Sequence, residues 1–440
     1  MKNKLIIYAL TTSSLFIACK QKPHANYNKA DTVVNSSRQE VKLPAPYETK
    51  AVKNFCEVIG WPKGKMPVAP AGFSVNLYAE GLDNPRNIYV AGNGDVFVSE
   101  ANTEISGIKK IGADIIGASK SQHYSKSANH ILLFKDTDGD GVPNSKTVFM
   151  SGLNQPYGML ILGDWFYVAN TDALWRYPYK LGDMKVSGKG VKILSLPAGG
   201  YNNHWTRNLC ANADGSKIYV SVGSGSNVAE HGMEHEKERA CILEVNPDGS
   251  GKRIYASGLR NPVGMALQPG TGALYTAVNE RDDLGDKLVP DYLTYVKEGG
   301  FYGWPWAYFG QHEDPVVAHN DPNPAMVKRT VVPDLALGAH TASLGLAFYT
   351  GTSFPQQYDN GAFIGQHGSW NSSKLVGYKV AFVPFNGNKP GGVVTDFLTG
   401  FIADNAKQKV YGRPVGVAVA KDGSLLVADD AGNKIWRVRH

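Results

Sequence analysis

The sequence predicts an all-β fold, a six-bladed β-propeller whose blades are four-stranded antiparallel sheets. Three observations lead to this prediction: one short phrase recurs six times, each copy is followed by a turn and a short strand, and no sustained helical period occurs. Sheet units in tandem suit a radial array, and closing the array into a ring protects its edge strands. A β-sandwich with chance similarity between hairpins is the alternative, and six copies argue against it.

The recurring phrase has the form Gly-Leu-x-Asn-Pro-x-Gly in its clearest copies, such as Gly258–Gly264. Two of the copies have lost the proline. The six copies are residues 81–88, 152–159, 203–209, 258–265, 340–346 and 412–417. In a propeller we expect each copy to lead into the strand beside the central axis.

A turn and a strand candidate follow each copy, as a hairpin requires. The strand candidates are residues 95–98, 165–168, 217–220, 273–276, 362–365 and 425–428, with further candidates between repeats at 130–134 and 241–245. Two linkers are long, and we expect residues 101–129 and 281–340 to be loops that decorate one face.

The composition suits a large globular protein with many turns. Of the 440 residues, 42% are hydrophobic, which is enough to build a core, and 49 are glycine. The formal net charge of +6 comes without a basic run. Nucleic acid is therefore not expected as a partner.

The N-terminus reads as an export signal. Lys2 and Lys4 precede an apolar stretch too short to span a bilayer, and it ends in a lipobox-like Leu15–Cys19. We expect residues 1–18 to be a lipoprotein signal peptide, Cys19 to carry the lipid, residues 19–50 to be a flexible tether, and 51–440 to be the propeller. The protein would then be anchored to a bacterial envelope membrane, facing the periplasm or the cell surface. An ordinary signal peptide cut nearby is the alternative.

Three further cysteines are Cys56, Cys210 and Cys241. Cys210 and Cys241 are expected on strands separated by a third, and two strand spacings of about 9.6 Å exceed disulfide reach. We therefore predict that they are not bonded to each other. No Cys-x-x-Cys-His motif is present, so covalently attached c-type haem is not predicted.

Corresponding positions of the six copies should form two rings around the channel mouth. Both rings are almost wholly polar where packing positions would be apolar, and a polar pocket at a propeller mouth is the default ligand site. The arginines among them suit an anionic ligand. The alternative is that these residues hydrogen-bond loops between blades. The first ring is Asp83, Asn154, His204, Arg260, Thr341 and Gly412, and the second is Asn84, Gln155, Trp205, Asn261, Ala342 and Arg413.

Four segments carry a family resemblance that runs from about residue 70 to the C-terminus. Residues 203–209, 220–230, 257–264 and 279–286 resemble the sorbosone dehydrogenase family, which is similar to the soluble glucose and aldose sugar dehydrogenases that depend on pyrroloquinoline quinone (PQQ). The resemblance implies a PQQ- and Ca²⁺-dependent enzyme. It would oxidise a sugar, a sorbosone-like sugar aldehyde or a related polyol, and pass electrons to an external quinone or cytochrome.

The resemblance also implies roles for individual residues. His204 would be the general base and Arg260 would assist catalysis beside the quinone oxygens. The cofactor would be held by Gln155, Arg260, Asn261, Arg413, His367 and Trp370, and the substrate would face Asn203, Gln155, Ser224 and Asn227. The Ca²⁺ site would be formed mainly by backbone carbonyls of Glu280, Arg281 and Asp282.

These roles agree with the chemistry of the groups. A histidine suits proton abstraction near neutral pH, and an arginine can stabilise the negative charge of a reduced quinone. Two departures from the glucose enzymes make glucose itself a doubtful substrate. Asn203 and Ser224 stand where those enzymes have acidic residues, and no lysine corresponds to their cofactor lysine around His367.

Other motifs and functions remain as alternatives. Residues 136–141 match the start of an EF-hand loop, but Thr147 stands at its twelfth position, so we expect a tight acidic turn. His231 and His235, with their neighbouring glutamates 230, 234 and 236, are expected in an exposed charged loop. A Ca²⁺-dependent propeller lactonase and a non-catalytic carbohydrate- or protein-binding propeller are the competing functions.

Overall fold

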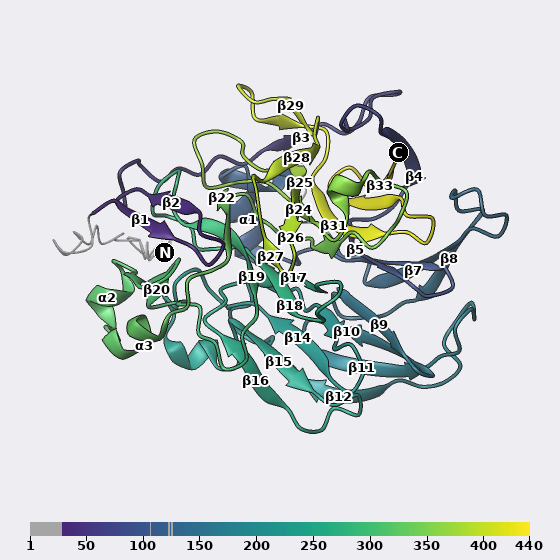
Figure 1. Ribbon diagram of the computed structural model, residues 1–440, viewed down its shortest axis with the longest axis horizontal. Coiled ribbons are helices and arrows are strands. Elements are labelled where there is room, and N and C mark those ends of the chain that lie inside the picture. Colours follow the sequence, from purple (N-terminus) through teal and green to yellow (C-terminus); the bar gives the residue numbers. More distant parts are fainter. Residues whose placement is uncertain (1–28, 106, 122–123, 125) are drawn as a thin grey trace, which may run out of the picture.

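The chain is seen in a computed structural model that describes residues 29–440 apart from 106, 122–123 and 125 (Figure 1). The expected signal peptide and Cys19 lie outside the described residues. Strands are the main regular element of the structure, and its recurring unit is a sheet of four antiparallel strands. The predicted all-β class and the four-stranded antiparallel unit are therefore confirmed.

Six four-stranded sheets follow one another along the described chain, and the strand candidates found after the repeats form their second strands. The first three contain β5 (Pro85–Val90), β6 (Val96–Glu100), β7 (His130–Lys135) and β8 (Ser145–Met150); β9 (Gly158–Leu162), β10 (Trp165–Ala169), β11 (Ala173–Pro178) and β12 (Val191–Ser195); and β13 (Leu209–Ala211), β14 (Ile218–Val222), β15 (Cys241–Val245) and β16 (Arg253–Ser257). The others contain β17 (Pro262–Leu267), β18 (Leu274–Val278), β19 (Pro290–Tyr295) and β22 (Leu335–Ala339); β23 (Ala347–Phe348), β24 (Ala362–Gln366), β25 (Lys379–Val383) and β28 (Thr395–Leu398); and β31 (Pro414–Val419), β32 (Leu425–Asp429), β33 (Lys434–Arg439) and β4 (Ser74–Glu80).

The last sheet joins the two ends of the domain. Its outer strand β4 comes from near the N-terminus and pairs antiparallel with β33 at the C-terminus, with Val75 opposite Val438 and Glu80 opposite Lys434. Because three strands of this sheet come from one end of the chain and the fourth from the other, the sheet cannot form until nearly the whole chain is present.

The first strands of successive sheets contact one another in a cycle. Contacts join β5 to β9, β9 to β13, β13 to β17, β17 to β23, β23 to β31 and β31 back to β5. The last glycine of the recurring phrase permits this close approach. A Cβ on Gly158 would lie 2.7 Å from the backbone nitrogen of Leu209, and one on Gly416 would lie 2.6 Å from the carbonyl oxygen of Arg86.

The two copies with asparagine at this position replace close approach by a hydrogen bond. Asn87 Nδ2 donates to the Tyr157 carbonyl at 3.1 Å, and Asn208 Nδ2 donates to the Val263 carbonyl at 2.8 Å. Glycine and asparagine at this position therefore have the same structural role, because each brings the first strand of one sheet close to the backbone of the first strand in the next sheet.

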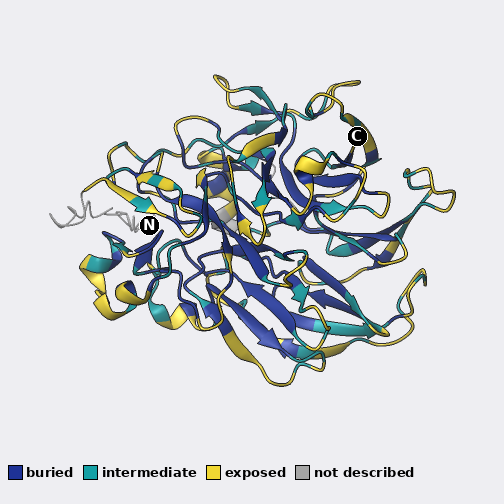
Figure 2. Ribbon diagram, in the orientation of Figure 1, coloured by how far each residue is buried: buried dark blue, intermediate teal, exposed yellow. Residues whose placement is uncertain are grey.

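The hydrophobic core lies between neighbouring sheets as well as within them. Phe97 and Phe149 of the first sheet pack against Phe166 of the second, with Tyr179 closing the cluster. The rings of Phe97 and Phe166 lie 4.9 Å apart, a spacing typical of favourable aromatic pairs. Figure 2 shows the strands of the interior buried, whereas the exposed residues lie mainly on the outer loops and outer strands.

The two long linkers contain more structure than the sequence predicted. Residues 101–129 include α1 (Gly107–Ile115) and the 3₁₀ helix η1 (Ala118–Ser121). Residues 281–340 were predicted to be loop, yet they supply β19 and β22 of the fourth sheet together with β20 (Ala307–Tyr308), β21 (His312–Glu313), α2 (Val317–Asn320) and α3 (Pro324–Arg329). The sequence hid these strands because the segment between them breaks the spacing of the repeat. Among the described residues, no helix is both long and apolar enough to cross a lipid bilayer.

Part of the segment expected to be a flexible tether has regular secondary structure. β1 (Asp31–Val34) and β2 (Glu40–Leu43) form an antiparallel hairpin, and Leu43 is buried in a core cluster with residues of the fourth sheet. The chain after this hairpin contacts the loop that follows β18, where Tyr47 N donates to the Leu284 carbonyl at 2.8 Å. A polar sequence can be ordered in this way when tertiary contacts supply partners for its backbone. Residues 51–58, including β3 (Glu57–Val58), continue along these loops.

The cysteine prediction is confirmed. Cys210 on β13 and Cys241 on β15 have β14 between them, and the three cysteines of the described chain are all free.

Replacing Gly158 with alanine is expected to lower the free energy of unfolding by about 1–3 kcal/mol, since the new methyl group would press on the next first strand. Gly92, where an added Cβ would meet nothing within 4 Å, is the matched control, and Gly92→Ala should change stability by less than about 0.5 kcal/mol. Urea denaturation measures both. Equal stability of the two variants would contradict the close approach.

Candidate functional site

The candidate site lies where the first strands begin and the second strands end. Because these strands are antiparallel, both termini lie at the same edge of each sheet. The recurring phrase therefore places its polar residues beside a second set that follows the second strands. This second set is Asn102, Thr171, Ser224, Glu280, His367 and Asp430.

His204 is held by Ser224 at this edge. Its Nδ1 lies 2.9 Å from both the carbonyl oxygen and the hydroxyl oxygen of Ser224. Burial and the neighbouring Arg260 guanidinium lower the pKa of His204 to about 3, so its imidazole is neutral at neutral pH. A neutral imidazole can accept a proton, which is the property that a general base requires.

Arg260 is buried among oxygen acceptors. Its Nη1 donates to the Glu280 carbonyl at 2.6 Å, and its Nη2 donates to Asn227 Oδ1 at 2.9 Å and to Asp282 Oδ2 at 3.1 Å. Asn261, the next residue in the chain, is also buried. Four residues that the sequence singled out, Arg260, Asn227, Glu280 and Asp282, are thus brought into one network.

The loop expected to hold Ca²⁺ carries both oxygen donors and cations. The Glu280 carbonyl accepts from Arg260, and the Asp282 carbonyl accepts from Arg281 Nε at 2.9 Å. Burial raises the pKa of the Glu280 carboxyl to about 7, although Arg260 lowers it in part. The Glu280 carbonyl keeps a second lone pair, but the Asp282 carbonyl also accepts from Asn227 Nδ2 at 3.4 Å. Two guanidinium groups beside the loop oppose a further cation. The donor set is therefore a poor fit for Ca²⁺ at this loop.

Arg413 lies in a second buried cluster at the same edge. Its Nε and Nη2 donate to the carbonyls of His367 and Gly368, each at 3.0 Å, and its guanidinium lies over the Tyr378 ring. Among the described residues, no carboxylate is within ion-pair distance of Arg413. Asp430 is near enough to favour the charge of Arg413 without a direct ion pair. A buried guanidinium whose hydrogen bonds go to carbonyls fits a site for an external carboxylate such as those of PQQ.

Asp430 is the centre of this second cluster, and the sequence analysis missed it. It forms an ion pair with Arg86 and lies 2.8 Å from His367 Nε2. Burial and Arg413 lower the pKa of His367 to about 4, against the opposing effect of Asp430. Arg86 also lies over the Trp205 ring at 5.4 Å, which connects the cluster to the phrase that contains His204.

Gln155 belongs to a chain of amides. Its Nε2 donates to the Asn102 carbonyl at 2.7 Å, and Asn102 Nδ2 donates to Asn84 Oδ1 at 2.9 Å. Asn84 Nδ2 then donates to the Asp430 carbonyl at 3.0 Å. Gln155 and Asn84 therefore hydrogen-bond the loops of neighbouring sheets, as the alternative interpretation of the two polar rings expected.

Three expected site residues have surroundings that the sequence did not predict. Trp370 stacks on Phe55 at 5.6 Å, so the N-terminal segment occupies one face of its indole. Asn203 is exposed beside His204. His367 is directed to Asp430 through Nε2.

A signal for the missed residues was present in the sequence. Asp430 and Asn102 follow second strands that had been identified correctly, and antiparallel pairing requires the ends of these strands to meet the start of the recurring phrase. The recurring phrase contains only the residues before the first strands, so it does not include the residues that follow the second strands.

The charged loop around His231 is less exposed than expected at His231 and at Glu236. His231 stacks on Tyr201, and Glu234 and His235 are exposed, but Glu236 is 5% exposed. The sequence could not show that Glu236 is buried, because Glu234, two residues earlier in the same charged run, is exposed.

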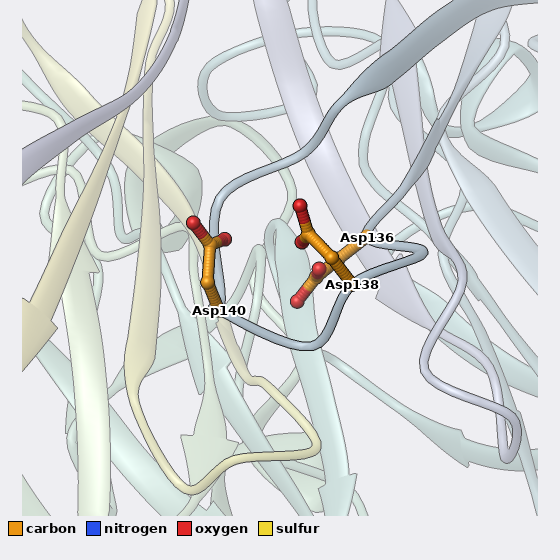
Figure 3. Close-up of side chains that lie close together, drawn as sticks. All are labelled: Asp136, Asp138 and Asp140. Carbon is orange, nitrogen blue, oxygen red and sulfur yellow. The ribbon is translucent and has the colours of Figure 1, made fainter.

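The acidic turn joins β7 to β8 at the edge of the first sheet that is opposite the candidate site. Asp136, Asp138 and Asp140 bring carboxylate oxygens within 4.8 Å of one another (Figure 3). Two oxygens of Asp136 accept hydrogen bonds from the backbone nitrogens of Gly139 and Gly141, each at 2.7 Å. The tight acidic turn is confirmed.

The fold is shared with solved PQQ-binding domains. The holo form of the pyranose dehydrogenase PQQ domain from Coprinopsis cinerea superimposes with a TM-score of 0.69 over 88% of this chain and 100% of that chain, at 20% sequence identity. The described part of the chain therefore has the same all-β fold, built of four-stranded antiparallel sheets, as that domain.

The chain belongs to the family of a domain of unknown function, DUF7133, whose profile matches residues 65–430. An uncharacterised protein of Borreliella burgdorferi is 31% identical over 297 residues, which cover 65% of this chain and 76% of that protein. The PQQ-dependent pyranose dehydrogenase of Coprinopsis cinerea is 22% identical, with 86% of this chain covered. The chain spans 55% of the length of that fungal relative.

Replacing His204 with glutamine is expected to flatten the acid side of the stability–pH curve. The pKa of His204 is about 3 in the folded protein against 6.5 for the free side chain, so between these pH values the unfolded state binds more protons. The free energy of unfolding therefore falls as pH drops from 6.5 towards 3, by at most about 1.4 kcal/mol per pH unit from this group. Urea denaturation at several pH values measures the slope. His235→Gln, at an exposed histidine, is the control, and an unchanged slope in His204→Gln would contradict the burial of this imidazole.

Replacing Asp430 with asparagine is expected to cost about 3–5 kcal/mol of unfolding free energy, since Arg86 would remain buried without its carboxylate partner. Denaturation midpoints measure the loss. Asp404→Asn, which removes an exposed pair with Lys407, should leave the midpoint almost unchanged. Equal midpoints for the two variants would show that the Arg86–Asp430 pair is not buried.

Proposed function

We propose that this chain is a PQQ-dependent oxidoreductase that oxidises a sugar, a sorbosone-like sugar aldehyde or a related polyol and passes the electrons to an external acceptor. The observation that carries the proposal is that a neutral histidine, His204, shares one edge of the sheets with two buried arginines, Arg260 and Arg413. His204 is suited to accept a proton, and the two arginines are suited to bind an anionic, oxygen-rich cofactor.

The proposed architecture is a closed six-bladed propeller. The cycle of contacts among the first strands supports closure, as does the pairing of β4 with β33 between the two ends of the domain. In a closed ring, the residues that precede the first strands surround one channel mouth, which is where a propeller binds its ligand.

The residues have distinct roles in the proposed reaction. When bound, PQQ would supply the two-electron oxidant that accepts a hydride from the substrate carbon. Arg413 and Arg260 would bind its carboxylate and carbonyl oxygens, with Asn261 and Gln155 beside them. Nε2 of His204 would accept the proton of the substrate hydroxyl, and Asn203, Ser224 and Asn227 would border the substrate.

Calcium dependence is implied by the family resemblance, but the residues of the expected loop fit Ca²⁺ poorly. Carbonyls of residues 280–282 would be the ligands, but Arg260 and Arg281 donate to them. The localisation is likewise a proposal, in which Cys19 carries a lipid and anchors the protein to a bacterial envelope membrane.

The lactonase alternative requires a metal ion held on the axis by carboxylates. Two carboxylates at this edge are paired with arginines instead: Asp282 with Arg260 and Asp430 with Arg86. This pairing favours the dehydrogenase. A non-catalytic propeller would have no need of a neutral base beside two buried arginines.

Dye-linked oxidation by the full-length protein is expected only after PQQ is added, and His204→Ala should lower kcat by about 10²–10⁴-fold, as loss of a general base does. The assay uses a panel of sugars, sugar aldehydes and polyols, with Ca²⁺ added or withheld. His235→Ala, at an exposed histidine, is the matched control. Turnover without PQQ, or full activity of His204→Ala, would contradict the proposal.

A further inference from the structure

Hydrogen bonds around Ser224 determine which nitrogen of His204 carries the hydrogen. Ser224 Oγ donates its only hydrogen to the Ser226 carbonyl at 2.7 Å. Towards His204 Nδ1 this hydroxyl can therefore act only as an acceptor, and the Ser224 carbonyl is an acceptor by nature. With two acceptors at 2.9 Å, Nδ1 must be the donor, and the lone pair of the neutral ring must be on Nε2.

A buried carboxylate holds the turn that contains these acceptors. Glu236 Oε2 accepts from the backbone nitrogen of Gly225 at 2.7 Å, and its Oε1 accepts from Ser226 Oγ at 2.5 Å. Ser224 and Ser226 are completely buried. Glu236 lies at the end of η2 (Met233–Glu236), in the loop that the sequence analysis assigned to solvent.

The same turn is tied to both sides of the candidate site. Ser224 N donates to the Arg260 carbonyl at 2.8 Å, and Asn203 N donates to the Gly225 carbonyl at 3.1 Å. A shift of the turn would therefore move the acceptors of His204 relative to the ring itself. The carboxylate of Glu236 is the only charged group that holds the turn among the contacts of the described residues.

We propose that Glu236, acting through the Ser224–Ser226 turn, is a positioning residue that fixes His204 as the Nδ1–H tautomer and leaves Nε2 free to accept the substrate proton. The catalytic part of this inference rests on the proposed function, whereas the tautomer is a property of the folded protein alone. Neutral serine oxygens orient the base here, and the carboxylate acts one step behind them.

The tautomer can be read from the ¹⁵N chemical shifts of the imidazole nitrogens in full-length protein labelled at histidine. The His204 signals are assigned by their loss in His204→Gln. We expect a single tautomer with hydrogen on Nδ1 in the unsubstituted protein. In Glu236→Gln one of the two acceptor contacts becomes an amide donor, so the shifts should move towards the average of the two tautomers.

Two further variants make the experiment decisive. Glu234→Gln changes an exposed glutamate of the same short helix and should leave the His204 shifts unchanged. Ser226→Ala removes one of the two contacts of Glu236 without altering a buried charge, so it replaces Glu236→Gln if that variant does not fold. Hydrogen on Nε2 in the unsubstituted protein, or unchanged shifts in both Glu236→Gln and Ser226→Ala, would overturn the proposal.

Turnover separates this inference from the proposed function. If the chain is the proposed dehydrogenase, Glu236→Gln should lower kcat about tenfold with little change in KM, which is part of the ~10²–10⁴ that a general base supplies. Tautomer averaging in a protein that does not oxidise sugars with PQQ would support the positioning role and reject the proposed function. Normal turnover of Glu236→Gln with unchanged His204 shifts would support the proposed function and reject the positioning role of Glu236.

Discussion

The close approach of the six first strands is the constraint on which the rest of the structure depends. Glycine at the last position of the recurring phrase removes a side chain where two backbones meet, and asparagine at the same position bridges them by a hydrogen bond. The residues just before this position are consequently held near those of the next sheet. A local packing requirement, repeated six times, thus gathers polar residues from widely separated parts of the sequence.

Burial then determines how these polar residues behave. His204 is kept neutral because burial and Arg260 both oppose its charged form. Arg260 and Arg86 have carboxylate partners in Asp282 and Asp430, whereas Arg413 is held by carbonyls and the Tyr378 ring. The site therefore combines a neutral acceptor of protons with a buried positive charge that an anionic ligand would compensate.

Much of the fold could be predicted from the sequence, because a repeat with a turn and an alternating strand is a local signal. The second strands, the separation of Cys210 from Cys241 and the acidic turn at Asp136 were predicted in this way. The strands inside residues 281–340 could not be, because β19 and β22 are partners separated by a long insertion. The hairpin at Asp31–Leu43 was missed because its sequence is polar and Leu43 is buried against residues far along the chain. In the site, the phrase revealed His204, Arg260 and Arg413. Asp430 and Glu236 were missed because each acts through a tertiary contact with a residue far along the chain or on a separate turn.

Calorimetric titration of the full-length protein with PQQ tests the central claim most directly, because it measures binding without assuming a substrate or an electron acceptor. We expect one PQQ bound per chain and an affinity about 10- to 100-fold lower in Arg413→Gln, the loss typical of a charged hydrogen bond. Absence of binding, or the same affinity in Arg413→Gln, would show that the buried arginines at the mouth serve a different ligand.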